Sequence, residues 1–192
     1  MFLFEEFGGS PINNRFRVQW FKVGPGQSLT FTCKSVRPLA LGVHWLRRVI
    51  LCPGQEVCPL CSTHSGRVNY YLFTGTSRNI GCLEIGEASW LKLCDQWEKE
   101  GKALGQSLLG RKFSLVRAAK NKGLQVSEIT PATECSPREA IDLVQQIAAL
   151  RRLFSLPNQQ LIDSPSSVEQ SFQEACLAAS RQAAAEFERL QG

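Results

Sequence analysis

One histidine and three cysteines fall close together in this chain, and their spacing constrains the fold more than any other feature does. The stretch reads HWLRRVILCPGQEVCPLC, residues 44–61, and only two residues separate its last two cysteines. Such a gap lets a tight turn present both sulfurs to one ion, and zinc prefers thiolate and imidazole ligands in a tetrahedron. The sequence therefore predicts a structural Zn²⁺ bound by His44, Cys52, Cys58 and Cys61.

Two alternatives stay open for this stretch. His64, three residues past Cys61, competes with His44 for the fourth position, because the run WLRRVIL must bend if His44 and Cys52 are to reach one ion. The Cys58–Cys61 pair could instead be a redox dithiol, although the helix and βαβ setting of such motifs are not visible. A catalytic zinc is not indicated, because protein ligands fill all four positions and no general base accompanies them.

Charge is distributed unevenly along the chain. Up to residue 130 there are 17 Lys and Arg against 9 Asp and Glu, and from residue 131 onward there are 5 against 8. A basic body favours a polyanionic partner, and the alternative is an ordinary basic surface. No apolar run is long enough to span a membrane, and MFLFEEFGG lacks the basic start of a signal peptide. We therefore expect a cytoplasmic protein with no membrane partner, in which the scattered cysteines are reduced core residues.

The alternation of apolar residues predicts an α+β fold that is mainly β. Runs rich in β-forming residues and separated by turn signals predict strands, and apolar residues at helical spacing (Trp90, Leu91, Cys94 and Trp97) predict a helix. The expected strands are 15–23 and 28–33, joined by the turn GPGQ, then 67–75 and 79–85, then a hairpin of 111–119 and 123–129, with the helix at 87–99. Five or so strands with one helix before the last two indicate a five-stranded OB-type barrel with a zinc-binding insertion, residues 1–130.

Residues 131–192 are predicted to form an α-helical C-terminal extension. Ser136-Pro137-Arg138-Glu139 has the pattern of a helix start, with expected helix 137–154, and a second capping pattern begins at Ser166. The second helix carries a narrow apolar stripe that fits either a partner helix or the body of this protein. The stripe consists of Val168, Phe172, Ala175, Ala179, Ala183, Phe187 and Leu190. We therefore expect the extension to bind a protein partner or to mediate self-association.

Residues 15–130 resemble the zinc-containing single-stranded DNA-binding proteins of tailed phages. The resemblance is carried by His44-Trp45, Cys52 and the closing CPLC, followed by GCLEIGEASWLKLCDQW and RKFSLVRAAKNKGLQVSEI, with WFKVGPGQSLTFT similar to the family's entry hairpin. It implies an OB fold, a structural zinc and nonspecific binding of exposed single strands in DNA replication, recombination or repair. It also implies a prokaryotic or phage-infected host and association with the nucleoid. The chain departs from the family at its end, FERLQG, where many members have a strongly acidic tail.

Binding of single strands requires cations for the phosphates and aromatic faces for the bases. The candidate residues are Trp20, Arg47, Arg48, Arg67, Tyr71, Phe73, Arg111, Lys112, Arg117, Lys120 and Lys122. For each aromatic the alternative is a place in the core, and for each cation it is an ordinary solvated side chain. We find no phosphate loop, nucleophile elbow or acid pair, so we expect neither enzymatic activity nor a small-molecule substrate.

The main prediction is therefore a sequence-nonspecific single-stranded DNA-binding protein. Two other functions fit the same residues. The first is an RNA-binding version of the domain. The second is a protein-interaction adaptor, in which the zinc and barrel are scaffold and the C-terminal helices bind a partner.

Overall fold

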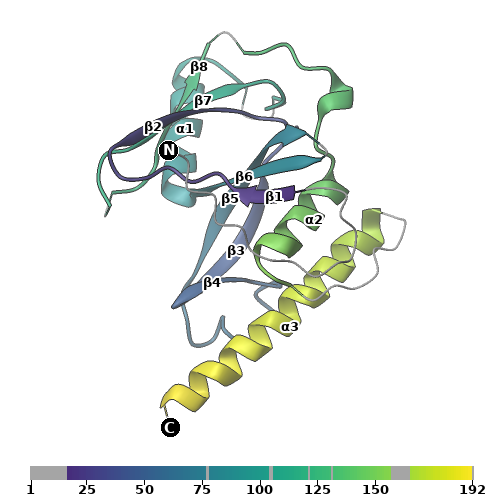
Figure 1. Ribbon diagram of the computed structural model, residues 1–192. Coiled ribbons are helices and arrows are strands. Elements are labelled where there is room, and N and C mark those ends of the chain that lie inside the picture. Colours follow the sequence, from purple (N-terminus) through teal and green to yellow (C-terminus); the bar gives the residue numbers. More distant parts are fainter. Residues whose placement is uncertain are drawn as a thin grey trace. The chain divides into compact units, whose positions relative to one another are not determined.

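The computed structural model describes residues 17–76, 78–103, 106–120, 122–130, 132–156 and 165–191. Over these residues the protein has the mixed α+β fold that the sequence predicts, with helices at its C-terminal end (Figure 1). The elements are β1 (Arg17–Trp20), β2 (Gln27–Thr32), β3 (Leu39–Leu46), β4 (Arg48–Leu51), β5 (Gly66–Thr76), β6 (Asn79–Gly86), α1 (Glu87–Lys99), β7 (Lys112–Arg117), β8 (Gln125–Ile129), the 3₁₀ turn η1 (Pro137–Glu139), α2 (Leu143–Leu153) and α3 (Pro165–Gln191). The strands form a sheet of order β1-β6-β5-β3-β4 and a second of order β2-β7-β8.

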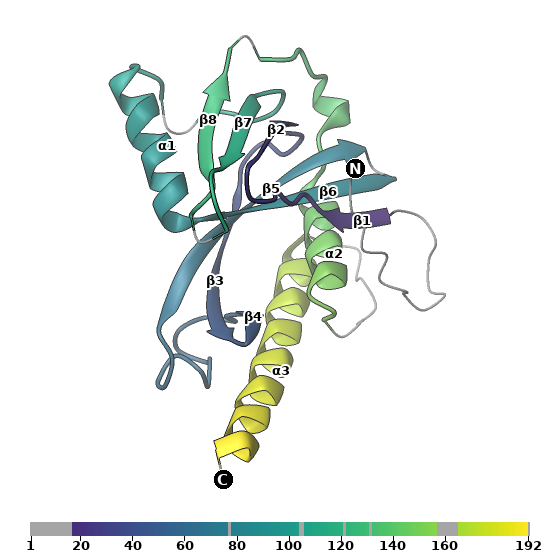
Figure 2. The ribbon, with the colours of Figure 1, turned by 60° about the vertical axis from the view of Figure 1, so that its left-hand side comes forward.

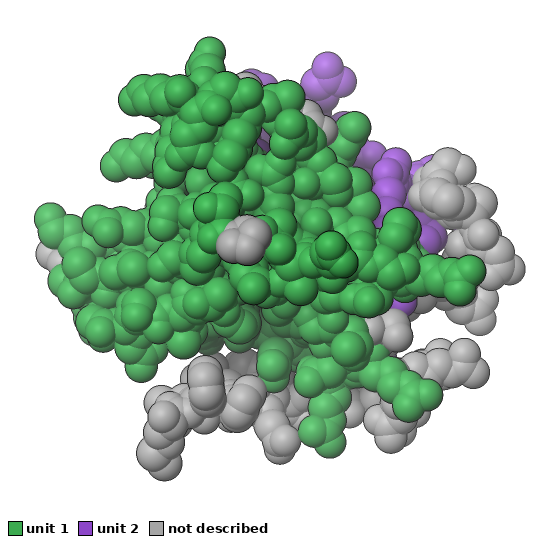
Figure 3. All heavy atoms as spheres, turned by 90° about the horizontal axis from the view of Figure 1, so that it is seen from above, with its two compact units in different colours: residues 1–38, 71–142 green, residues 39–70, 143–192 purple. Residues whose placement is uncertain are grey.

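The chain divides into two compact units (Figure 3). Unit 1 comprises residues 1–38 and 71–142, and unit 2 comprises residues 39–70 and 143–192. This division differs from the expected boundary at residues 130 and 131, because the cysteine-rich stretch groups with the C-terminal helices. Strand β5 contributes its first residues to unit 2 and its remainder to unit 1.

In unit 1, the strands β2, β7 and β8 and the helix α1 share a core. Strand β7 pairs antiparallel with both β2 and β8, and α1 lies alongside β8 (Figure 2). Phe31 and Phe113 lie opposite each other in the β2–β7 register, and both are fully buried. The turn and helix expectations hold here, since 111–129 forms the expected hairpin and α1 spans 87–99.

The helix α1 presents a different face from the one expected. Trp90 and Trp97 are buried, as expected, and their rings pack edge to face at 5.8 Å. Leu91, however, is 50 % exposed, whereas Leu93 is buried. Helical spacing also places residue 93 next to residues 90 and 97 on one face, and the strands pack against that face.

The expected hairpin of 15–23 with 28–33 does not form. A turn exists at Gly24–Gln27, where Gly26 has φ 72°, but β1 pairs parallel with β6 and β2 pairs antiparallel with β7. The local turn residues were therefore identified correctly, whereas the strand partners are distant in sequence. Turn chemistry fixes where a chain bends but not which strand it joins.

The expected helix 137–154 is shorter than predicted. Only η1 and α2 are helical, and Ala140 between them has extended backbone angles. The Ser136 side chain accepts from the Arg138 amide as an N-cap, but the Glu139 carboxylate pairs with Lys34 instead of completing a capping box. The Ile141 amide donates to the Lys34 carbonyl, which keeps the chain extended until residue 143.

In unit 2, the β3–β4 hairpin and the helices α2 and α3 pack together, with α3 beside both α2 and β4 (Figures 1 and 2). The apolar stripe of α3 packs against the rest of unit 2. This matches one of the two alternatives, the protein's own body, and not the partner helix. Val168, Phe172, Ala175 and Ala183 are buried, and only its end at Leu190 is strongly exposed. None of the helices in the described residues is long and apolar enough to cross a membrane.

A buried carboxylate in unit 1 organises the contact between α1 and the β7–β8 hairpin. Glu128 on β8 accepts from Trp97 Nε1 and Lys102 Nζ at 2.9 Å each, and from Arg111 Nη1 at 3.3 Å. The Arg111 guanidinium lies 5.1 Å from the centre of the Trp97 ring. Removing one partner of such a group leaves a buried charge uncompensated.

We predict that Glu128→Ala lowers the free energy of unfolding by about 3 kcal/mol, because Arg111 then stays buried without its partner. Urea titration measures this change. Glu128→Gln is the matched control, because it keeps an acceptor for Trp97 and loses only the charge, so it should cost less than the alanine variant. Equal stability of the wild type and Glu128→Ala would contradict this role of the carboxylate.

Candidate metal centre

A tight hairpin brings His44 and Cys52 together. The run WLRRVIL does bend, because Arg47 adopts a left-handed conformation (φ 56°) between β3 and β4. His44 then lies opposite Ile50 in the register, and the Cys52 amide donates to the Gly42 carbonyl at 2.8 Å. Since side chains alternate along a strand, Cys52 lies on the same face as Ile50 and His44.

The residue opposite Cys52 has no side chain to compete for this space. A β-carbon at Gly42 would lie 3.1 Å from the Cys52 β-carbon, closer than carbon atoms normally pack. A β-carbon at Gly66 would lie 3.4 Å from His44 Cε1, which is an ordinary van der Waals contact. Glycine at position 42 therefore leaves room for the Cys52 side chain.

The loop after β4 supplies the remaining two sulfurs. The Val57 and Cys58 amides donate to the Gly54 carbonyl at 3.2 and 3.0 Å, and the Cys61 amide donates to the Cys58 carbonyl at 3.3 Å. Pro53-Gly54 thus turns the chain back, and CPLC forms the tight turn that a two-residue gap allows.

The four side chains form a cluster whose dimensions suit a tetrahedral ion. Their ligand atoms all lie within 4.8 Å of one another. The Cys52 and Cys61 sulfurs are 3.6 Å apart, and His44 Nε2 lies 3.4 Å from Cys58 Sγ and 3.5 Å from Cys61 Sγ. A tetrahedral zinc would separate two sulfurs by about 3.8 Å, and a sulfur from a nitrogen by about 3.5 Å. The cluster is thus a possible metal site with four protein ligands.

The geometry places His44, and not His64, beside the three cysteines. His44 belongs to the cluster, and burial lowers its pKa, an effect that the backbone carbonyls of His64 and Ser65 partly oppose. A lowered pKa favours the neutral imidazole, which is the form that binds metal. The His64 ring instead contacts Thr63 Oγ1 at 2.8 Å and packs edge to face on Phe187 at 4.8 Å.

Burial disfavours the ionised form of two thiols in the cluster. Burial, followed by the neighbouring thiols of Cys52 and Cys58, raises the pKa of Cys61 to about 12. Burial is also the main reason why the pKa of Cys52 is raised. Thiolates are the metal-binding form, and a divalent ion supplies the positive charge that stabilises them.

The C-terminal helix packs against this cluster within unit 2. Ala183 on α3 joins a buried group with Ile50, Cys58 and Leu60. The Gln173 side chain on α3 also donates a hydrogen bond from Nε2 to the Pro53 carbonyl at 2.8 Å. The cysteine-rich loop therefore contacts α3 along more than two turns of the helix.

Three of the residues expected to contact nucleic acid are buried. Tyr71 and Phe73 have no exposed surface, and Leu72 between them is also fully buried, so both faces of β5 are covered at this point. Arg111 is 9 % exposed and is paired with Glu128. These three residues support the core instead, which corrects the role predicted for them.

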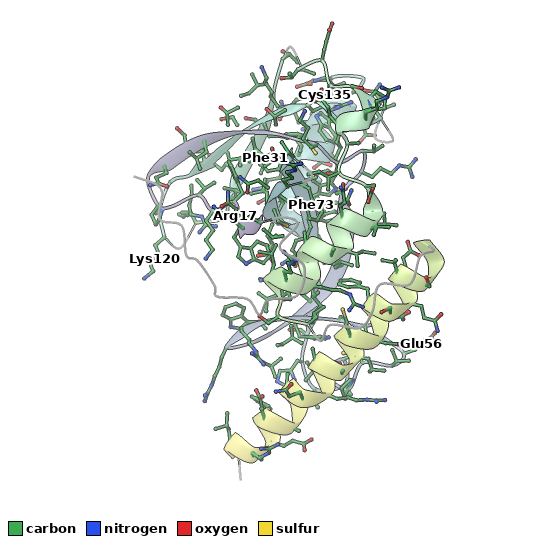
Figure 4. The ribbon with its side chains drawn as sticks, turned by 45° about the vertical axis from the view of Figure 1, so that its right-hand side comes forward. Arg17, Phe31, Glu56, Phe73, Lys120 and Cys135 are labelled. Carbon is green, nitrogen blue, oxygen red and sulfur yellow. The ribbon has the colours of Figure 1, made fainter. Side chains whose placement is uncertain are left out.

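The other expected contact residues reach solvent to different degrees. Trp20 is half-buried with its ring 6.3 Å from Tyr71, and Lys112 and Arg117 on β7 are also half-buried. Arg48 is exposed but lies 3.6 Å from Glu186 on α3. The remaining candidates are exposed: Arg47, Arg67, Lys120 and Lys122. Lys120 extends outward from the loop between β7 and β8 (Figure 4).

One exposed residue was missed among the candidates. Trp45 is 62 % exposed, and it is the one strongly exposed aromatic side chain within the described ranges. The sequence did contain a signal for it. If His44 points inward to a metal, strand alternation directs its neighbour to the opposite face.

Comparisons of this chain with protein-family models, curated proteins and solved structures returned no match.

We predict that His44→Ala abolishes stoichiometric metal binding and that His64→Ala does not, because only His44 lies among the three sulfurs. Elemental analysis of the purified variants measures the metal content per chain. His64→Ala is a matched control, since it removes the same ring from the same unit. Loss of metal in the His64 variant with retention in the His44 variant would reverse the assignment.

Proposed function

We propose that the ion held by His44, Cys52, Cys58 and Cys61 is zinc and that its role is structural. Three sulfurs and one imidazole form a ligand set typical of structural zinc, and four protein ligands leave no open position for substrate. The ion would tie the β3–β4 hairpin to the following loop. Because β4 has only four residues, the free energy of metal binding would help to stabilise the hairpin and the loop.

We further propose that the protein binds single-stranded DNA with little sequence preference. The observation that carries this proposal is the surplus of cations up to residue 130 together with the exposure of Arg47, Arg67, Lys120 and Lys122. None of these four has an ion-pair partner among the described residues. Phosphates of a polynucleotide are the ligands that such unpaired cations suit best.

The OB-type barrel is part of the same proposal. Two features support it: α1 lies between β6 and the β7–β8 hairpin, and β2 pairs with β7. Pairing of an early strand with a late one is what closes a Greek-key barrel of this type. The β7–β8 loop would then lie at the rim of the barrel, where oligonucleotides bind.

The adaptor function is less well supported. It requires a free face on the C-terminal helices, and the α3 stripe from Val168 to Ala183 is largely buried within unit 2. An RNA-binding version uses the same cations, and competition between matched DNA and RNA oligonucleotides separates the two.

We predict that Lys120→Glu/Lys122→Glu weakens binding to a short oligothymidylate and reduces the salt dependence of the affinity. Each lost phosphate contact should lower the slope of log K against log salt by about 0.7 for a single strand. Fluorescence anisotropy at several salt concentrations gives both quantities.

The control for this variant is Lys92→Glu/Arg181→Glu, which changes the net charge by the same amount at exposed positions on α1 and α3. It should weaken binding less and leave the slope nearer to that of the wild type. If both double variants behave alike, the loop makes no specific contact. If the wild type shows no affinity at low salt, the proposed function is wrong.

A further inference from the structure

The β3–β4 hairpin has two faces with different chemistry. His44 and Cys52 point to the metal cluster on one face, which the cluster and α3 cover. Trp45 follows His44 directly and pairs with Val49 in the register, so its ring lies on the opposite face. Trp45 is 62 % exposed, whereas Val43, two residues earlier on the same face, is buried.

The neighbouring strand β5 adds a cation to the face of Trp45. A β-carbon at Gly66 would contact the His44 ring at 3.4 Å, so residue 66 points toward the metal cluster. Arg67 is the next residue along β5 and therefore points to the other side of the sheet. Since β3 and β5 are adjacent strands, Arg67 and Trp45 lie on the same face of unit 2.

The two arginines at the hairpin turn differ in their partners. Arg48 pairs in the register with Leu46 on the metal-cluster face, and its guanidinium lies 3.6 Å from Glu186. Arg47 occupies the turn itself, and neither it nor Arg67 has an ion-pair partner among the described residues. The single acid in residues 39–70 is Glu56, in the loop after β4.

We propose that Trp45, Arg47 and Arg67 form a stacking platform for one unpaired base of single-stranded DNA and its flanking phosphates. This proposal rests on the proposed function and names the site for it. An exposed indole accepts the flat face of any base, and unpaired guanidinium groups attract phosphate without reading sequence. A duplex hides its base faces, so this combination favours an unpaired strand.

The metal centre gives the platform its rigidity. Two of the four ligands, His44 and Cys52, belong to the hairpin that carries Trp45. A fixed ring loses less conformational entropy when a base stacks on it than a mobile ring would lose. The ion and the base would thus use opposite faces of the same two strands.

The test is a titration of a fluorescent oligothymidylate into the full chain and five variants at several salt concentrations. Trp45→Ala should weaken binding about tenfold without changing the salt slope, because it removes stacking but no charge. Trp45→Phe keeps an aromatic face and should bind nearly as tightly as the wild type. Arg47→Gln and Arg67→Gln should each lower the slope by about 0.7.

Arg48→Gln is the matched control, because it removes the same charge one residue from Arg47 and on the other face. It should change the slope less than Arg47→Gln does. The zinc content of every variant verifies that the hairpin is intact. Equal affinity of Trp45→Ala and the wild type, or equal slopes for the Arg47, Arg48 and Arg67 variants, would overturn the platform.

The outcomes separate this inference from the function on which it rests. Tight, salt-dependent binding by the wild type that the platform variants leave unchanged would refute the platform alone. Absence of binding by the wild type would refute both. Preference for a matched oligouridylate over the DNA strand would replace DNA by RNA as the ligand.

Discussion

The reversal of the chain at Arg47 is the constraint on which the rest of unit 2 depends. Without it, β3 and β4 would form one extended strand, and His44 and Cys52 would lie at opposite ends. With it, the two side chains share one face, and the CPLC turn brings two further sulfurs within reach. A left-handed non-glycine residue costs conformational energy, and contacts on both strands must compensate for it.

The same reversal links the candidate metal centre to the C-terminal helix and to the proposed DNA surface. One face of the hairpin carries His44 and Cys52 and packs on α3 through Ile50 and Ala183. The other face presents Trp45 to solvent. In the proposed function, therefore, the helix and the ion act on the side of the hairpin that the nucleic acid does not touch.

Features that depend on residues close together in the sequence could be predicted, and features that depend on distant residues could not. The clustering of His44 with three cysteines, α1 and the β7–β8 hairpin could be predicted, because each is encoded by residues near one another in the chain. The partners of β1 and β2 could not, since local turn residues at 24–27 carry no information about distant strands. The predicted helix 137–154 is not helical around residues 140–142, because Ile141 and Glu139 bind Lys34, about a hundred residues away. Tyr71 and Phe73 were misassigned because alternation shows which residues share a face, but not whether that face is covered.

X-ray absorption at the zinc edge reports the atoms bound to the metal in the purified protein, so it examines the proposed zinc centre itself. We expect one zinc per chain, with three sulfurs at about 2.3 Å and one nitrogen at about 2.0 Å. A protein that purifies without stoichiometric zinc, or a coordination shell made mainly of oxygen, would contradict this expectation.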